Sequence, residues 1–259
     1  ADGYVNTNNN TYVAWCWKAG TSFTNDASAT GIGATDSAGS VNDTAGFSVC
    51  TYTGVGGTST TIKHGLSTAP TVMLIKNRSD ADDWGVYHQG IGNTNRLYLN
   101  NTDASTSSIG TFRNTSPTNS IFTVGDHASV NTSGENYVAY IFAEKQGFSK
   151  FGSYTGNGND DGTFVYTGFK PAFVLQKCSS DTGSWHIHDS KRSINGTDKY
   201  LYADTNEAEV STTRMDFLSN GFKLKSNHDV WNGSGRTNVY MAFSSSPFTT
   251  STGIPTTAR

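Results

Sequence analysis

Residues 131–142 read Asn-Thr-Ser-Gly-Glu-Asn-Tyr-Val-Ala-Tyr-Ile-Phe, and residues 232–243 read Asn-Gly-Ser-Gly-Arg-Thr-Asn-Val-Tyr-Met-Ala-Phe. Both segments begin in a glycine-bearing turn and continue as an apolar strand. Other motifs return at the same offset of 101 residues: Gly46-Phe47-Ser48 as Gly147-Phe148-Ser149, and Pro70, Trp84 and His127 as Pro171, Trp185 and His228. A fixed period identifies the structural unit, and a unit of about 100 residues can bury its own core. The sequence therefore predicts two tandem modules.

The composition indicates an all-β protein. Charged residues make up 15% of the chain, the net charge is −3, and aromatic residues make up 12%. Asn, Ser, Thr and Gly supply turns, while Tyr, Phe, Val and Ile favour strands. Phosphate binding requires clustered Lys and Arg, which this sequence lacks, so we expect no nucleic-acid partner. No apolar run approaches the length of a transmembrane helix, so we expect no membrane partner.

Short runs with the period of a strand fill each copy. Pro70–Lys76 and Pro171–Lys177 are apolar runs that begin at proline, as a central strand buried on both faces can. Asn220-Gly221 is a hairpin signal before the alternating run Phe222–Ser226. These patterns predict tandem antiparallel β-sandwich modules, Ig-sized or jelly-roll-like. Their expected bounds are 46–147 and 148–248, followed by a C-terminal tail over 249–259.

The N-terminal residues repeat a closing strand without a module before it. Tyr12–Ala19 reads Tyr-Val-Ala-Trp-Cys-Trp-Lys-Ala and matches Tyr137–Glu144 of the first copy. We therefore expect residues 1–45 to be the last strand of a preceding copy plus a linker, and the strand to pair with the next module or with a neighbouring chain. On this interpretation Ala1 is not the natural start of the protein, and Arg259 is its natural end.

The histidines and cysteines are weak candidates for metal ligands. His186 and His188 lie on one face of a predicted strand and can share a metal, but Gly85 and Tyr87 replace them in the other copy. A half-exposed strand face is therefore the favoured interpretation. The three cysteines have no metal-ligand spacing and no repeated disulfide, so we expect buried or half-buried thiols at Cys16, Cys50 and Cys178.

Calcium is the only ion that a motif suggests. Asn157, Asn159 and Asp161 match the first half of a calcium loop, but Gly168 stands where the loop requires Glu. A hairpin turn is the alternative, because Asn, Asp and Gly belong in turns. The loop Asp80–Asp83 is a second acidic turn of the same kind. No other cofactor is expected.

Aromatic side chains next to turns are candidates for stacking on a sugar. Trp84 and Trp185 recur in both copies, which favours a core role for them. Trp231 has no aromatic counterpart, since Val130 stands opposite it, and a loop residue that differs between copies is the better binding candidate. The predicted ligand-binding residues are Trp231, Tyr98, Tyr202, His186 and His188.

Hydrolysis of a glycan requires two carboxylates, and the sequence supports such a pair poorly. The chain contains four glutamates, none of which lies in an aromatic setting that recurs. Asp189 with Glu135 is the pair to test. Nucleotide loops, zinc spacings and nucleophile elbows are absent from the sequence.

Several phrases resemble a repeat module of large virion proteins from marine bacteriophages, including cyanophages and related podoviruses. They are Asn10–Gly20, His64–Pro70, Gly147–Gly158 and Asp216–Leu224, and the resemblance covers nearly the whole chain. In that family the module often lies at the C-terminal end of tail or fibre proteins, and it has no established catalytic residues. The resemblance implies a location in the virion rather than an activity.

The resulting expectation is a structural and adhesive protein of a tail fibre or other surface appendage. Its expected partners are other virion subunits, a second copy of itself in a homo-oligomer, and a glycan of the host surface. We expect it on the virion surface after assembly in the host cytoplasm. Two alternatives stay open: a virion-borne glycan depolymerase, and a purely architectural decoration or filament subunit without a ligand.

Overall fold

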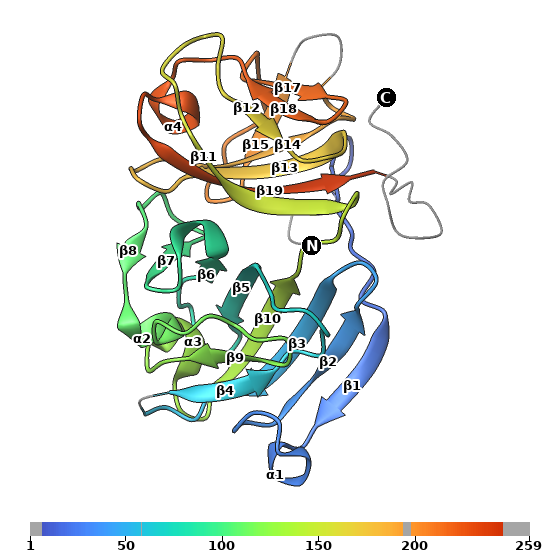
Figure 1. The fold of residues 1–259 in the computed structure, drawn as a ribbon, viewed down its shortest axis with the longest axis vertical. Helices are drawn as coiled ribbons and strands as arrows, with labels where there is room; N and C mark the ends of the chain where they lie inside the picture. Colours follow the sequence, from blue (N-terminus) through green and yellow to red (C-terminus); the bar gives the residue numbers. More distant parts are fainter. Residues whose placement is uncertain (1–6, 58, 194–197, 246–259) are drawn as a thin grey trace.

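The computed structural model describes residues 7–57, 59–193 and 198–245 (Figure 1). Most of the regular structure is β-strand, arranged in four antiparallel sheets that make up two modules. This confirms the predicted all-β class of tandem antiparallel β-sandwich modules.

The first module pairs a large sheet with a small one. The large sheet has the order β1-β2-β3-β10-β5-β6-β7-β8, which places β10 at its centre, and β4 and β9 form the small sheet. The bounds are β1 Thr21–Asn25, β2 Ser37–Asn42, β3 Phe47–Thr53, β4 Thr60–Lys63, β5 Val72–Asn77, β6 Gly85–His88, β7 Asn95–Tyr98, β8 Thr106–Ser107, β9 Ile121–Val124 and β10 Asn136–Phe142.

The second module repeats this plan. Its large sheet has the order β11-β19-β13-β14-β15-β16, and its small sheet has the order β12-β18-β17. The bounds are β11 Ser149–Thr155, β12 Phe164–Tyr166, β13 Pro171–Cys178, β14 Trp185–Asp189, β15 Asp198–Tyr202, β16 Val210–Thr212, β17 Met215–Leu218, β18 Gly221–Leu224 and β19 Thr237–Ser244. The strands β3, β10, β5 and β6 thus correspond to β11, β19, β13 and β14.

Short helices fill the turns, and two of them also correspond. The helices are α1 Ala27–Thr30, η1 Gln89–Ile91, α2 Ile109–Phe112, α3 Ala128–Asn131 and α4 Asp229–Asn232. A histidine caps the N-terminus of α3 and of α4, in each case through its side chain. The hydroxyl of Tyr52 donates to the carbonyl of Val130 at 2.7 Å, and that of Tyr154 donates to the carbonyl of Trp231 at 2.8 Å. The residues that repeat in the sequence therefore make equivalent hydrogen bonds in the two modules.

The strand register departs by one residue from the offset of the repeated motifs. Phe47 pairs with Phe142, whereas it is Ser149, not Phe148, that pairs with Phe243. The strands β3 and β11 therefore correspond at an offset of 102. Burial explains the shift, because a strand displaced by one residue would turn Lys150 instead of Phe151 toward the apolar core.

Three apolar cores hold the molecule together. One lies inside each module, between its large and small sheets. The third lies between the two large sheets and takes residues from both modules, including Phe142 and Val86 of the first and Phe243 and Trp185 of the second. The molecule is therefore a stack of small sheet, large sheet, large sheet and small sheet (Figure 1).

Polar contacts also join the modules. The indole Nε1 of Trp185 donates to the carbonyl of Tyr98 at 2.7 Å, and the ammonium of the buried Lys177 lies 3.4 Å from the carbonyl of Thr102. Burial lowers the pKa of Lys177 to about 8. Both of these buried donors have an acceptor in the other module.

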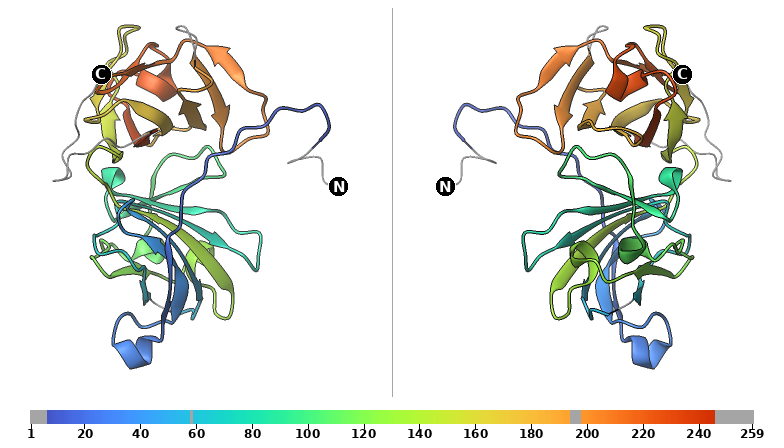
Figure 2. Two further views of the ribbon diagram at one scale, coloured as in Figure 1. Left: turned by 90° about the vertical axis from the view of Figure 1, so that its right-hand side faces the viewer. Right: turned by 90° about the vertical axis from the view of Figure 1, so that its left-hand side faces the viewer.

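The predicted strand near the N-terminus is wrong for the described residues. Residues 7–20 form an extended segment outside every sheet, which runs from β1 alongside the second module (Figure 2). Trp15, Trp17 and Ala19 are half-buried and alternate with exposed residues, and Trp17 and Ala19 pack against the core between the modules. The sequence pattern was that of a strand, but no strand in the described part of the chain pairs with this segment.

Residues 19–45 are not a linker either. The hairpin of β1 and β2 extends the large sheet of the first module, because β2 pairs with β3 along its length. Cys50 and Cys178 are buried as predicted, and burial raises the pKa of the Cys50 thiol to about 12. Cys16 is exposed, so the prediction for that thiol was wrong.

We expect Phe243→Ala to destabilise both modules together. The Phe243 ring lies 5.8 Å from that of Phe142, 5.2 Å from that of Phe151 and 5.3 Å from that of Trp17. Its loss should lower the free energy of unfolding by about 3–5 kcal/mol, as for other buried phenylalanines. Urea unfolding followed by fluorescence and circular dichroism should still show one transition, at lower urea. The half-exposed Phe164→Ala is the matched control and should cost less than about 1 kcal/mol. Two separate transitions in the unmodified protein would contradict a shared core.

Candidate functional site

A group of aromatic side chains, several of them half-buried, lies at the edge of the core between the modules. It lines a hollow of about 400 Å³, the inter-module cleft. Its lining residues are Trp15, Trp17, Phe47, Leu74, Trp84, Tyr140, Phe142, Phe173, Leu175, Met241 and Phe243. These residues come from the N-terminal segment and from the facing large sheets of both modules, so the cleft exists only because the modules stack.

Ring packing fixes the walls of the cleft. Trp84, just before β6, stacks on Tyr140 of β10 with a centroid distance of 6.1 Å and an interplanar angle of 21°. Trp17 meets Phe173 edge to face at 5.6 Å. Trp84 and Tyr140 are half-buried, so part of each ring faces the solvent. Edge-to-face and offset-stacked pairs are the favoured arrangements of aromatic rings, and they hold these side chains in place.

A second hollow of about 390 Å³ adjoins the cleft. The two share Trp15, Trp17, Phe47, Phe173 and Phe243, so both lie against the N-terminal segment. The guanidinium of Arg192 lies 5.6 Å from the centre of the Trp15 ring, within the range of a cation–π contact. The segment is thus held by rings of both modules and by one cation of the second.

The chemistry of the cleft suits an apolar partner. All its lining side chains are apolar or aromatic, and none is charged. Such a surface binds by removing apolar area from water, at about 25 cal/mol per Å². Aromatic and aliphatic side chains of another protein fit it better than a hydroxyl-rich ligand does, because few polar partners are at hand.

Trp231 is buried and not a loop residue open to a ligand. Its side chain in α4 is 2% exposed and lies with its ring centroid 3.8 Å from that of His186. The first module holds Val130 and Gly85 in these places, and a Cβ on Gly85 would lie 3.2 Å from a methyl group of Val130. At this contact the first module therefore has a small pair of residues, Val130 and Gly85, and the second has a large pair, Trp231 and His186. The difference between copies reflects packing.

His186 and His188 are also buried, so the predicted half-exposed strand face is wrong. His186 Nδ1 lies 3.2 Å from the side-chain oxygen of Gln176, and His188 Nδ1 lies 2.9 Å from a carboxylate oxygen of Asp198. Burial, and to a lesser extent the neighbouring His188, holds the pKa of His186 well below its ordinary value. Across residues 7–57, 59–193 and 198–245, no three His, Cys, Asp or Glu side chains are grouped to hold a metal.

Tyr98 and Tyr202 lie apart from the cleft. The Tyr98 ring lies under the guanidinium of Arg96 at 4.7 Å, and its hydroxyl is 3.3 Å from His127 Nε2. The Tyr202 hydroxyl is 3.5 Å from that of Tyr200. The structure places Tyr202, His186, His188 and Trp231 around one core and Tyr98 in the other module, so the five predicted residues do not form one site.

The predicted calcium loop is a hydrogen-bonded turn built around Asn232. The side-chain amide of Asn232 donates to Asn157 Oδ1 at 2.7 Å and to the carbonyl of Asn159 at 2.9 Å. The carboxylate of Asp161 is paired with Lys223 at 2.5 Å. Oxygen atoms that a calcium ion would need are therefore bound to donors of the protein, which favours the hairpin turn of the two alternatives.

The carboxylates proposed for hydrolysis are in different modules. Glu135 accepts a hydrogen bond from the side-chain amide of Asn77 in the first module. Asp189 forms an ion pair of 2.6 Å with Arg192 in the second. Two carboxylates must flank one bond for glycoside hydrolysis, and this pair does not share a site.

Sequence reasoning missed Trp15, Trp17 and Trp84 as surface residues. Trp84 recurs in the repeat and was assigned to the core, where only its counterpart Trp185 is fully buried. The usable signal was the alternation Trp15-Cys16-Trp17, which places both indoles on one side of an extended chain. Three of the five tryptophans line the cleft.

The fold defines an all-β protein of two fused modules with an apolar cleft between them. The family model for DUF7483, described as a domain of unknown function, matches residues 1–247, and the chain belongs to this family. No curated protein and no solved structure shows significant similarity to the chain. None of the helices in the described residues is long and apolar enough to cross a membrane.

Two further histidines, His64 and His88, are buried, and their hydrogen bonds favour the neutral imidazole. His88 Nδ1 accepts from the backbone N–H of Gly90, and its Nε2 donates to the carbonyl of Tyr240 in the other module at 3.1 Å. His64 Nδ1 accepts from Leu66 N–H, and its Nε2 donates to the carbonyl of Thr118. Burial lowers the pKa of each to about 4.

We therefore expect the protein to lose stability as the pH falls from 6.5 to 4. In the unfolded chain these histidines take up protons near pH 6.5, whereas in the folded chain they do so near pH 4, so acid favours the unfolded state. Each should cost about 2 kcal/mol of unfolding free energy between pH 7.5 and 5. Urea titrations at both pH values measure the loss. His88→Gln keeps an N–H for Tyr240 and should reduce the loss by about that amount, whereas Gln89→Asn, at an exposed neighbouring residue that does not titrate, should not change it. An equal loss in His88→Gln would contradict this assignment.

The inter-module cleft should bind the fluorescent apolar anion 8-anilinonaphthalene-1-sulfonate in the folded protein. Exposed apolar surface enhances the emission of this probe. Trp84→Asp places a charge in the wall of the cleft and should lower the enhancement several-fold. Val55→Asp, at an exposed apolar residue outside the cleft, is the matched control and should bind the probe like the unmodified protein. Equal emission from all three proteins would show that the probe binds elsewhere.

Proposed function

We propose that this chain is a structural and adhesive protein of a phage virion, within a tail fibre or another surface appendage. The observation that carries the proposal is the core shared by the two large sheets, which packs the two sandwiches against each other. A rigid element of neutral, hydrogen-bonding side chains suits a part that must transmit force and keep its shape outside a cell. The resemblance of Asn10–Gly20 and Gly147–Gly158 to virion repeat modules points the same way.

The inter-module cleft is the proposed contact with other virion subunits, including further copies of this chain. It offers half-buried aromatic rings without any charged side chain, as the centres of protein interfaces do. Interfaces owe most of their affinity to a few aromatic anchors in such pockets. Trp84 and Trp17 are the anchors we assign on this chain.

A host-surface glycan is the proposed ligand of the adhesive role. The chain carries 15% charged residues, so its surface offers hydrogen bonds from amides and hydroxyls more than fixed charge. Glycans are suited to such a surface, because they present hydroxyl groups and few charges. The alternative of a glycan depolymerase receives no support from Glu135 and Asp189, which lie in separate hydrogen-bonded settings. The other alternative, a purely architectural subunit, differs from the proposed function only in that the chain binds no glycan.

Localisation and adhesion are tested on intact particles. Antibodies raised against the purified chain should label the surface of virions of a phage that encodes it, as seen by electron microscopy, and should slow adsorption of the phage to host cells. Antibodies absorbed with the purified chain are the control. Labelling confined to lysates, with unlabelled particles, would contradict a virion protein. Labelled particles with unchanged adsorption would favour the architectural alternative.

A further inference from the structure

The second module has a groove at its outer edge, away from the inter-module cleft. The groove has a volume of about 720 Å³ and lies between the start of β11 and the end of β12. It is lined by Glu144, Gln146, Gly147, Ser149, Lys150, Tyr166, Thr167, Gly168 and Asn220. We call it the β12 groove. A hollow of this size accommodates a small ligand of one or a few rings.

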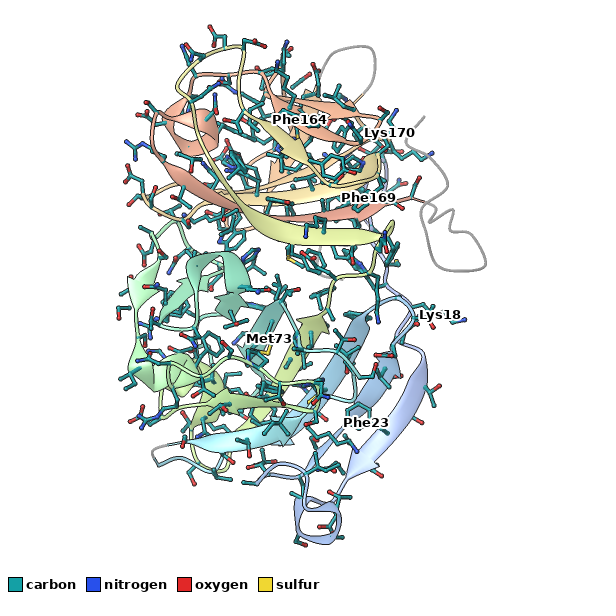
Figure 3. All side chains as sticks on the ribbon, viewed as in Figure 1. Lys18, Phe23, Met73, Phe164, Phe169 and Lys170 are labelled. Atoms are coloured by element: carbon teal, nitrogen blue, oxygen red, sulfur yellow. The ribbon has the colours of Figure 1, made fainter. Side chains whose placement is uncertain are left out.

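The first module fills the same place with its own chain. The side chain of Phe23 in β1 lies against Gly65, where an added Cβ would come within 2.8 Å of the ring. Ser37 of β2 donates to the carbonyl of Lys63 at 3.0 Å, and Thr35 forms a β-bridge with Ile62. The hairpin of β1 and β2 thus covers the end of β4, and Figure 3 labels Phe23 at this position.

Within residues 7–57, 59–193 and 198–245, no hairpin occupies the corresponding place in the second module. Its β11 is the outermost strand of the large sheet, and Gly168 corresponds to Gly65, with φ of +82° against +81°. A carboxylate oxygen of Glu144 accepts the N–H of Phe151 at 2.8 Å. This side chain therefore occupies the edge of β11 where β2 pairs with β3 in the first module. Glu144 thus takes up one of the N–H groups that an added strand would use, which disfavours pairing at this edge and favours a small ligand in the groove.

Two residues of β12 differ from their counterparts in a way that suits a ligand. The pairing of Val165 with Phe222 and of Ile62 with Phe122 aligns Phe164 and Tyr166 with Thr61 and Lys63. Phe164 is 44% exposed and Tyr166 is 65% exposed (Figure 3 labels Phe164). The copy with an open groove thus carries exposed aromatic rings, and the copy with a filled groove carries small or charged side chains instead.

Polar groups stand around the Tyr166 ring in fixed places. Lys150 and Glu144 form an ion pair of 2.8 Å along one wall. The backbone carbonyl of Asn220 accepts from the N–H groups of Thr167 and Gly168, which holds that residue at the opposite wall. Within the described part of the chain, the side-chain amides of Gln146 and Asn220 make no hydrogen bond. They offer donors and acceptors to a ligand.

We propose that the β12 groove binds a carbohydrate, with Tyr166 as the platform. A sugar ring has an apolar C–H face that packs on an aromatic ring, and hydroxyl groups that both donate and accept. The amides of Gln146 and Asn220 and the Glu144–Lys150 pair supply the matching partners. This inference rests on the adhesive role proposed above and adds the site and the chemical class of its ligand.

The test uses the full chain on a glycan array, followed by calorimetric titration with maltotriose, cellotriose and chitotriose. We expect saturable binding of one oligosaccharide class by one site per chain. Tyr166→Lys introduces the residue of the first module and should weaken binding about tenfold or more, whereas Tyr166→Phe keeps the ring and should stay within about threefold. Lys63→Tyr is the matched control, since it adds a tyrosine where Phe23 and the hairpin fill the groove, and the stoichiometry should stay at one.

Two outcomes would overturn the proposal: no binding on the array and none of the three oligosaccharides, or binding that Tyr166→Lys leaves unchanged. Thermal unfolding of Tyr166→Lys should match that of the unmodified chain, which separates loss of binding from loss of folding. The antibody experiment on virions is independent. Blocked adsorption without saccharide binding would reject the groove alone, and saccharide binding by a protein that does not label virions would reject the virion proposal alone.

Discussion

The contact between the two large sheets is the constraint on which the rest of this structure depends. Each large sheet is apolar on both faces: one face is covered by the small sheet of its own module, and the other is covered by the large sheet of the partner module. A module alone would expose the ring of Phe142 or Phe243 and the strands around it. The N-terminal segment adds Trp15 and Trp17 to the same apolar layer, and the cleft is the part of that layer left uncovered.

Much of the fold was predictable because the central strands are buried on both faces, and such strands appear in the sequence as apolar runs. Pro70–Lys76 and Pro171–Lys177 contain the unbroken apolar runs 72–75 and 172–175, and they form β5 (Val72–Asn77) and β13 (Pro171–Cys178) in the middle of the large sheets. A strand that was solvated on one face would have alternated. Such apolar runs also indicate that two sandwiches stack, because a single sandwich of two sheets buries only one face of each sheet.

The candidate sites were less predictable, because the sequence does not show which side chains face each other. Trp231 and His186 differ from their counterparts together, and only the 3.8 Å contact shows that one change accommodates the other. Tyr12–Ala19 has the pattern of β10, but pairing requires neighbouring strands that a local pattern cannot reveal. The difference between copies became informative at Phe164 and Tyr166 only once the pairing register identified their counterparts.

The two modules use equivalent surfaces to meet: Tyr140 and Phe142 on one side, and Met241 and Phe243 at the same strand positions on the other. A contact between two equivalent surfaces covers both of them. The head-to-tail stacking of solenoid repeats, in contrast, leaves one contact surface uncovered after every addition. Each module therefore covers the apolar face of the other, and a single module separated from its mate would expose that face and be prone to aggregation.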